Sequence, residues 1–264
     1  MRMIVCVKQV PGTSNVEMDA ETGVMKRDST RGKLNPFDLF ALEQALDIKE
    51  RVGGSVAALS MGPMQAAASL KEALYMGADE AYLLCDRALI GSDVLATSRA
   101  ISGAIKRIGG ADVIFCGKQT TDGDTAQVGP EVAEMLGIGH VSNVIRFDEI
   151  RERELILTAA FERTEYICRV QTPVLVSIEK DVNTPRLPSY KRMKAMKDCK
   201  VTMISVSGLE DSDPTHYGIS GSATSVVRIF APEKQTKHSF FEADGEAVAE
   251  MFMAAMKERK LIYE

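Results

Sequence analysis

The sequence predicts an α/β fold in which a doubly wound, mostly parallel sheet is covered by helices on both faces. Strand and helix signals alternate through the first half of the chain, and this order favours parallel strands joined by helices. The chain has 264 residues, of which 45% are hydrophobic and 26% charged, so it can form one large globular domain with an extension.

Four short apolar runs are typical of buried strands. Asn35 followed by Pro36 indicates the start of the first helix, because asparagine caps well and proline suits the first helical position. Pro63 and Ser92 begin the second and third helical patterns. The predicted strands are residues 3–8, 55–60, 80–85 and 111–116.

The second half of the chain changes character. Residues 140–180 contain strand-like runs that predict an antiparallel addition to the sheet. Beyond them the chain is rich in proline and polar residues, a composition that suits wrapping around another protein, until a final helix is predicted at 245–260. We therefore expect a nucleotide-binding α/β domain at 1–182 and a C-terminal arm at 183–264.

The most informative segment is the polar turn 117–130, between the fourth strand and a helix predicted at 131–137. Unpaired backbone N–H groups at a helix N-terminus, together with the helix dipole, favour an anion. Gly117, Gly123 and Gly129 carry no side-chain bulk, so a phosphate could approach the backbone. The turn predicts nucleotide or phosphate binding; the alternative is an ordinary polar loop, although loops of this length usually have a function.

The turn matches neither the Walker sequence nor Gly-x-Gly-x-x-Gly. Asp122 and Asp124 would repel a phosphate, so we expect them to cap the helix or contact ribose hydroxyls, while Lys118 supplies positive charge. Ligands of such sheets bind at the carboxyl ends of the strands. The loops expected at this edge are 8–11, 61–63, 86–92 and the turn itself, with the corner 35–38 beside them.

Composition excludes several classes of function. A net charge of −5 without a large basic patch argues against nucleic acid. The five cysteines form no C-x-x-C pair and the three histidines have no ligand spacing, so no metal site is indicated. No apolar run approaches a membrane span, and a strand begins at once, so we expect a cytoplasmic protein without a signal peptide. The basic run 191–197 is either a solvated helix face or a docking surface.

Several segments together resemble the beta subunit of electron-transfer flavoproteins, in order and over nearly the whole chain. The resemblance implies the adenine nucleotide alpha hydrolase-like form of the α/β fold. The segments that carry it are 5–11, 35–38, 41–46, 60–63, 70–79, 117–130 and 183–186.

The resemblance implies a heterodimer with an alpha subunit that carries FAD. It also implies a nucleotide in this subunit, which is AMP in respiratory-type members and a second FAD in the electron-bifurcating members of anaerobes. That FAD takes hydride from NADH. One electron then goes to ferredoxin or flavodoxin, and the other passes through the alpha-subunit FAD to an acyl-CoA dehydrogenase or reductase-type partner. Because a flavin performs the redox chemistry, the protein needs no catalytic residue of its own.

The resemblance also assigns site residues. The adenosine part of the nucleotide is expected at Cys6, Asn35, Pro36, Phe37, Asp38 and Met61. The phosphates are expected at the backbone of Gly117, Lys118, Gln119, Asp122, Gly123, Asp124, Thr125, Ala126, Gln127 and Val128. A protein-docking loop is expected at 183–194, with Tyr190 as the apolar anchor and Leu187 as a second candidate.

Segment 86–98 is similar to one typical of the bifurcating group and supplies Asp93, Thr97 and Ser98 as possible flavin contacts. The sequence departs from that group at Leu89, where an aromatic residue is common, and at Val94, where a threonine is common. The hairpin turn at 162–166 also lacks the family's glycines. The alternative for 86–98 is a capped helix start without ligand contact.

Three other hypotheses stay open. The first is a non-bifurcating electron carrier with structural AMP. The second is an adenine-nucleotide-binding regulatory or stress domain, which would not need the extension at 183–240. The third is an ATP-pyrophosphatase-type enzyme, which would carry a Ser-Gly-Gly-x-Asp-Ser-like loop after the first strand, where this chain has Lys8-Gln9-Val10-Pro11.

Overall fold

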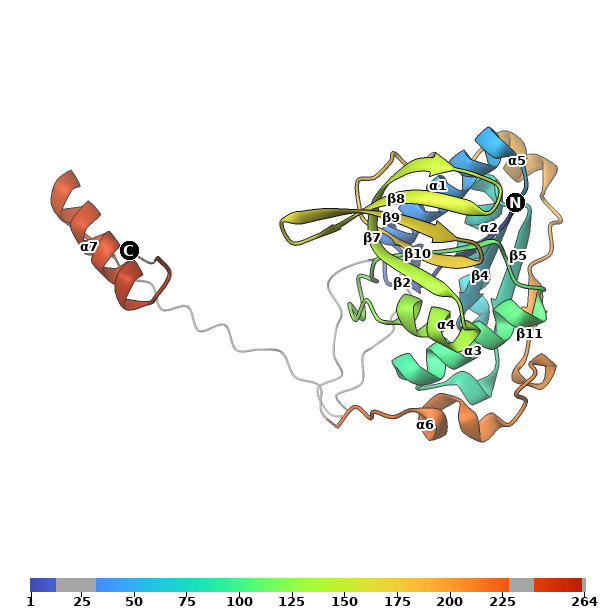
Figure 1. Cartoon of the computed structure of the whole chain (residues 1–264). Helices are drawn as coiled ribbons and strands as arrows, with labels where there is room; N and C mark the ends of the chain where they lie inside the picture. The colour runs from blue at the N-terminus through green and yellow to red at the C-terminus, as the bar shows by residue number, and fades with distance from the viewer. Residues whose placement is uncertain (13–31, 228–239, 263–264) are drawn as a thin grey trace. The chain divides into compact units, whose positions relative to one another are not determined.

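The computed structural model describes residues 1–12, 32–227 and 240–262 (Figure 1). The chain divides into two compact units, Met1–Val227 and Arg228–Glu264. The first contains the sheet, and all of the site residues predicted from the sequence lie in it.

The described residues form one nine-stranded sheet in the order β11-β5-β4-β1-β6-β10-β7-β8-β9. Neighbours from β11 to β7 pair in parallel, and β8 and β9 extend the sheet as antiparallel strands. The predicted α/β fold is therefore confirmed. The strands are β1 (Arg2–Cys6), β4 (Ser55–Met61), β5 (Glu80–Leu84), β6 (Val113–Gly117), β7 (Gly139–Ile150), β8 (Glu154–Phe161), β9 (Thr164–Gln171), β10 (Val174–Ile178) and β11 (Thr202–Ile204), with a separate small ladder of β2 (Gln9–Val10) and β3 (Lys33–Leu34).

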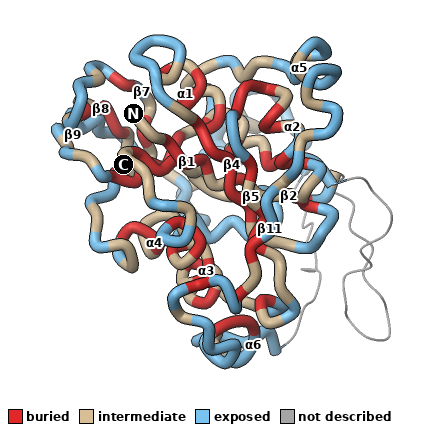
Figure 2. Tube along the Cα trace, turned by 90° about the vertical axis from the view of Figure 1, so that its right-hand side faces the viewer, coloured by how far each residue is buried: buried red, intermediate tan, exposed pale blue. Residues whose placement is uncertain are grey.

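Helices cover both faces of the sheet. One core packs α1 and α2 against one face, and a second core packs α3 and α4 against the other. Figure 2 shows the buried residues concentrated along the central strands β1, β4 and β5. The α-helices are α1 (Pro36–Val52), α2 (Ala67–Met76), α3 (Val94–Arg107), α4 (Val128–Leu136), α5 (Tyr190–Ala195), α6 (Gly218–Gly221) and α7 (Gly245–Glu258); the 3₁₀ turns are Met64–Ala66, Arg87–Leu89, Val206–Gly208 and Pro214–His216.

Local sequence explains these elements. The core residues of β1 are fully buried, because helices cover both of its faces, and this is why the strand reads as a continuous apolar run. Helix α2 stops at Gly77, whose φ of 149° suits glycine. Helix α4 begins at Val128, three residues before the sequence pattern predicts; Pro130 lies in its first turn, where no intrahelical N–H bond is lost.

The strand order creates a switch point between β1 and β6. The chain leaves β1 towards β4 and β5, then returns through α3 to place β6 on the other side of β1. In open α/β sheets, the carboxyl ends of two such strands form a crevice where ligands bind. The loops after β1 and β6 therefore define the edge at which a site is expected.

Part of the predicted C-terminal arm belongs to the sheet, because β11 pairs in parallel with β5. Residues 228–239 of the arm lie outside the described residues. The final helix predicted at 245–260 is α7, which Asp244 caps by accepting a hydrogen bond from the Ala247 amide. Wrapping of the arm around another protein stays a prediction.

The β8–β9 hairpin gives a stability prediction. Phe161 pairs with Thr164, and Glu162 between them has a φ of 52°, a left-handed conformation that is unfavourable for residues with a side chain. We expect Glu162→Gly to raise the free energy of unfolding by about 1 kcal/mol in denaturant titration. Arg163→Gly should not stabilise, since Arg163 has no positive φ; equal effects of the two changes would refute this explanation.

Candidate functional site

Asp38, in the first turn of α1, joins the two loops at the switch point. Its carboxylate accepts hydrogen bonds from the Lys8 amide at 2.8 Å and from the Gly117 amide at 3.1 Å. These amides follow β1 and end β6, respectively, and only 4% of Asp38 is exposed. Asp38 therefore holds the carboxyl ends of both strands together from the α1 face of the sheet.

Burial controls the protonation of this region. It raises the pKa of Asp38 to about 7, against hydrogen bonds from Lys8, Asn35 and Gly117 that lower it. Burial, with a further contribution from Asp38, raises the pKa of the Cys6 thiol to about 12. The pKa of Cys116 is raised as well, mainly by burial. Both thiols are therefore protonated and unreactive at neutral pH, and they add no negative charge to the edge.

Asn35 fixes the first half of the loop after β6. It is fully buried; its side-chain amide donates to the Gln119 carbonyl at 2.9 Å, and its side-chain oxygen accepts from the Thr121 amide at 3.3 Å. The sequence predicts that 35–38 contacts the adenosine part of a nucleotide. In the structure, Asn35 and Asp38 direct their polar atoms to the protein backbone, and the neighbouring Pro36 and Phe37 are half-buried.

The second half of this loop, 121–127, is exposed. Asp124 and Ala126 have positive φ angles of 54° and 56°, so left-handed residues alternate with others, as in backbone nests that bind anions. The next residues form the N-terminus of α4. Within the described residues, no hydrogen bond uses the amides of Thr125, Ala126, Gln127, Val128 and Gly129. These amides are available for an anion at the start of a helix.

Two lysines flank the loop. Lys8 pairs with Asp122 at 2.8 Å, and Lys118 pairs with Glu179 at 2.7 Å. The sequence predicts Lys118 as the source of positive charge, but its ammonium is directed to Glu179. Lys8 is the lysine that contacts the exposed part of the loop, and its position directly after β1 is the signal that could have identified it.

The glycines of the loop have different roles. A Cβ on Gly117 would lie 2.6 Å from Asp38 Oδ1 and from the Phe37 carbonyl carbon, and one on Gly129 would lie 2.8 Å from Cys116 Sγ. Both positions therefore need glycine because neighbouring protein atoms, and not a ligand, occupy the space that a side chain would fill. A Cβ on Gly123 would meet nothing closer than Thr120 Oγ1 at 3.5 Å. Of the three glycines expected to make room for a phosphate, only Gly123 faces open space.

The start of α3 agrees with the capped-helix alternative for Asp93. One carboxylate oxygen accepts from the Ala96 amide at 3.0 Å, and the other accepts from the Thr224 amide and hydroxyl. Thr97 is half-buried. Met61, at the end of β4, is half-buried and packs against the second core.

Ser98 is fully buried, and its hydroxyl has no hydrogen-bond partner. It lies one turn before Ser102, whose hydroxyl contacts the Met135 sulfur on α4 at 3.8 Å. Glu131 lies one turn before Met135, and one of its carboxylate oxygens is also buried without a partner. Ser98 lies on α3 and Glu131 on α4, two helices that pack against each other, and Glu131 is in the first turn of α4, which follows the open amides. Glu131 is a candidate site residue that the sequence pattern did not identify.

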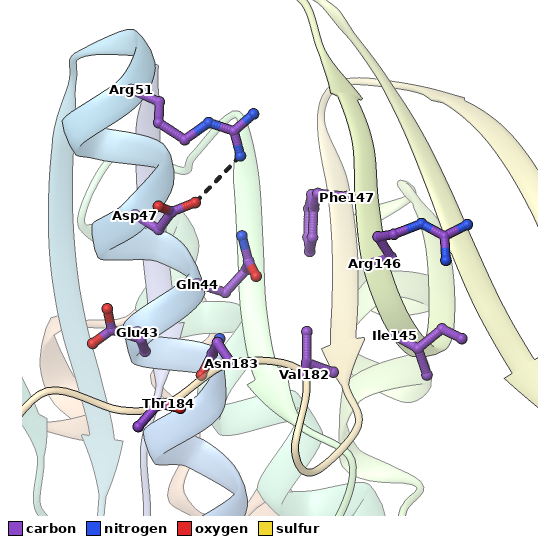
Figure 3. Close-up of a pocket in the computed structure, with 10 residues that line it drawn as sticks. All are labelled: Glu43, Gln44, Asp47, Arg51, Ile145, Arg146, Phe147, Val182, Asn183 and Thr184. Carbon is purple, nitrogen blue, oxygen red and sulfur yellow. Dashed lines mark hydrogen bonds and ion pairs between the residues drawn. The ribbon is translucent and has the colours of Figure 1, made fainter.

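A cavity of 350 Å³ lies between α1 and β7, and Figure 3 shows the residues that line it. A second cavity, of 530 Å³, lies beside Tyr82 and Arg107. Neither is lined by a residue that the sequence assigns to a cofactor.

The described part of the chain contains neither a cluster of metal-ligating residues nor a membrane-spanning helix. No group of three or more His, Cys, Asp or Glu residues there could hold a metal ion. Within the same ranges, no helix has both the length and the apolar character needed to cross a bilayer. The predicted docking residues Leu187 and Tyr190 are 85% and 74% exposed, respectively.

Comparisons with known proteins agree with one another. Residues 22–208 match the family model described as the electron transfer flavoprotein domain. The chain is 41% identical over 263 residues to the electron transfer flavoprotein subunit beta of Thermoanaerobacterium thermosaccharolyticum, covering 99% of this chain and 100% of the relative. It is 39% identical to the protein of that name from Clostridium acetobutylicum, with the same coverage. It is 40% identical to the caffeyl-CoA reductase-Etf complex subunit CarD of Acetobacterium woodii, covering 88% of each chain.

Proposed function

The chain belongs to the electron transfer flavoprotein family, among relatives of its beta subunit, and we propose that it binds FAD as part of an electron-bifurcating flavoprotein. In this proposal the FAD lies along the carboxyl edge of the sheet. When bound, it would accept hydride from NADH and pass electrons to ferredoxin or flavodoxin and, through the FAD of an alpha subunit, to an acyl-CoA dehydrogenase or reductase-type flavoenzyme.

The observation that carries the proposal is the series of open amides from Thr125 to Gly129. A diphosphate needs several N–H donors at once, and a helix N-terminus supplies them with a favourable dipole. The Lys8 ammonium lies beside the same loop, because it pairs with Asp122 there. Asp38 and Asn35 support the cofactor indirectly, because they fix the backbone that carries these amides.

Two observations favour FAD over AMP. Ser98 on α3 and Glu131 on α4 each keep a buried polar atom without a partner, and the ribityl hydroxyls that FAD has and AMP lacks are groups that could pair with them. The similarity to a subunit of a caffeyl-CoA reductase-Etf complex points in the same direction. The AMP alternative is supported by Asp93, whose carboxylate is fully used in capping α3 and in binding Thr224.

We further propose that the chain forms a heterodimer with an alpha subunit, which residues 183–264 contact. The exposed side chains of Leu187 and Tyr190 would anchor the acyl-CoA dehydrogenase or reductase-type partner. Large apolar side chains that are this exposed are typical of interaction sites.

A nucleotide count tests the proposed function. The chain is co-expressed with the alpha subunit, the purified complex is denatured, and the released nucleotides are separated and quantified. Two FAD for each heterodimer is the expected result. One FAD with one AMP would support the non-bifurcating alternative, and a nucleotide on the isolated chain without any alpha-subunit complex would contradict both.

A further inference from the structure

Within the docking loop expected at 183–194, residues 187–191 form the proposed docking segment. It carries the exposed Leu187 and Tyr190 and is followed in α5 by Met193, which is 41% exposed. Exposed lysines lie in and just after this segment, although the chain as a whole has a net charge of −5. These lysines are Lys191, Lys194, Lys197 and Lys200.

Arg186 links the start of the segment to α1 through hydrogen bonds and ion pairs. Its guanidinium donates to the Glu43 carboxylate through Nε at 2.9 Å and Nη2 at 2.8 Å, and it also pairs with Glu50. The Arg186 backbone amide donates to Glu43 as well, at 2.9 Å. Hydrogen bonds to Glu43 and Glu50 raise the pKa of Arg186, so the guanidinium keeps its charge. A planar group bonded at several points restricts both the position and the direction of the chain.

Arg192 fastens the other end to α2. Its Nε donates to the Leu74 carbonyl at 3.0 Å and its Nη2 to the Ala78 carbonyl at 2.9 Å, at the C-terminal end of the helix, where carbonyls lack intrahelical partners. The Ser189 amide donates to the Tyr75 carbonyl at 3.0 Å. The segment is therefore held at both ends, by two different helices.

We infer that Arg186 and Arg192 are positioning residues that hold the docking segment in one conformation, so that Leu187 and Tyr190 are presented to an apolar pocket rimmed by carboxylates. This inference rests on the proposed function, which assigns docking to the segment. A segment that is ordered before binding loses less conformational entropy in the complex. The exposed lysines match an acidic rim and would speed association.

The test uses the complete heterodimer with Arg186→Gln. Hydrogen exchange of the Ser189 amide, which donates to the Tyr75 carbonyl, is expected to accelerate by about tenfold. The KM for a purified acyl-CoA dehydrogenase from the same organism should rise by about tenfold with kcat little changed. FAD content and reduction of the small dye dichlorophenolindophenol should stay the same. Arg186→Lys should bring the exchange rate and the KM only part of the way back to the wild-type values, because an ammonium cannot make the two parallel hydrogen bonds that the guanidinium makes to Glu43.

Arg51→Gln is the matched control, because it removes another arginine pair on α1, with Asp47, that does not involve the segment. It should change neither hydrogen exchange nor KM. Arg192→Gln tests the other end independently if the Arg186 variant folds poorly. Unchanged exchange of the Ser189 amide in both variants would overturn the inference, as would faster exchange with an unchanged KM. If replacing Leu187 and Tyr190 by alanine leaves KM unchanged, the docking assignment itself is wrong.

Discussion

Replacing Asp38 by alanine is expected to lower the free energy of unfolding by about 3 to 5 kcal/mol, since two buried amides would lose their acceptor and a cavity would remain. The amides are those of Lys8 and Gly117, at the ends of β1 and β6. Because Gly117 ends β6 and Lys8 lies in the loop after β1, the loop after β6 should loosen as well. Denaturant titration measures the loss, and hydrogen exchange at 117–121 locates it.

Asp38→Asn is the control, because it keeps the shape and one carbonyl oxygen while removing the titrating group. A pKa of about 7 in the folded chain, above the usual 3.8, means that the folded state binds this proton more tightly than the unfolded state does. The corresponding stability is complete below about pH 4 and is lost as the pH rises through about 7. The wild-type chain should therefore lose stability relative to Asp38→Asn over that window. A relative gain would show that the hydrogen bonds from Lys8 and Gly117 outweigh burial.

The sequence predicted the first half of the fold well, because each strand there is largely buried and is separated from the next by a helix with a clear start signal. Asn35 stands at the N-cap of α1 but makes no side-chain capping bond, whereas Asp93 caps α3. The region 140–180 was harder to predict. β7 pairs in parallel with β10 on one side and antiparallel with β8 on the other. A strand-like pattern reports which faces are buried but not the direction of the neighbour, so β7 could not be assigned to both arrangements from sequence.

The candidate site shows a similar limit. The glycines and polar residues after β6 identified the loop, but not what each glycine does. Position 117 needs glycine because a Cβ there would collide with Asp38 and Phe37. Position 129 needs glycine because a Cβ there would collide with Cys116. The first of these contacts comes from far away in the sequence, on α1. Glu131 was missed for a similar reason, since the burial of its unpaired carboxylate oxygen is a property of the folded chain and not of the local sequence.

Gly123→Val is expected to abolish nucleotide retention, with affinity falling by at least about 100-fold. The backbone at Gly123 has no positive φ, and a Cβ there would have ordinary contacts with Thr120 and Lys8, so the folded chain should accept the substitution. The branched side chain would instead occupy the open space through which a diphosphate approaches the loop. Nucleotide content of the purified heterodimer measures the effect, and thermal unfolding without nucleotide checks the fold.

Gly139→Val is the matched control, because a Cβ there meets nothing within 4 Å and the residue lies at the start of β7, away from the carboxyl edge. It should retain the nucleotide. Gly117→Ala would be uninformative about binding, since its Cβ would collide with Phe37 and Asp38 whether or not a ligand is present. If Gly123→Val keeps a full complement of nucleotide, the phosphates do not approach this side of the loop, and the amides of α4 do not bind them as proposed.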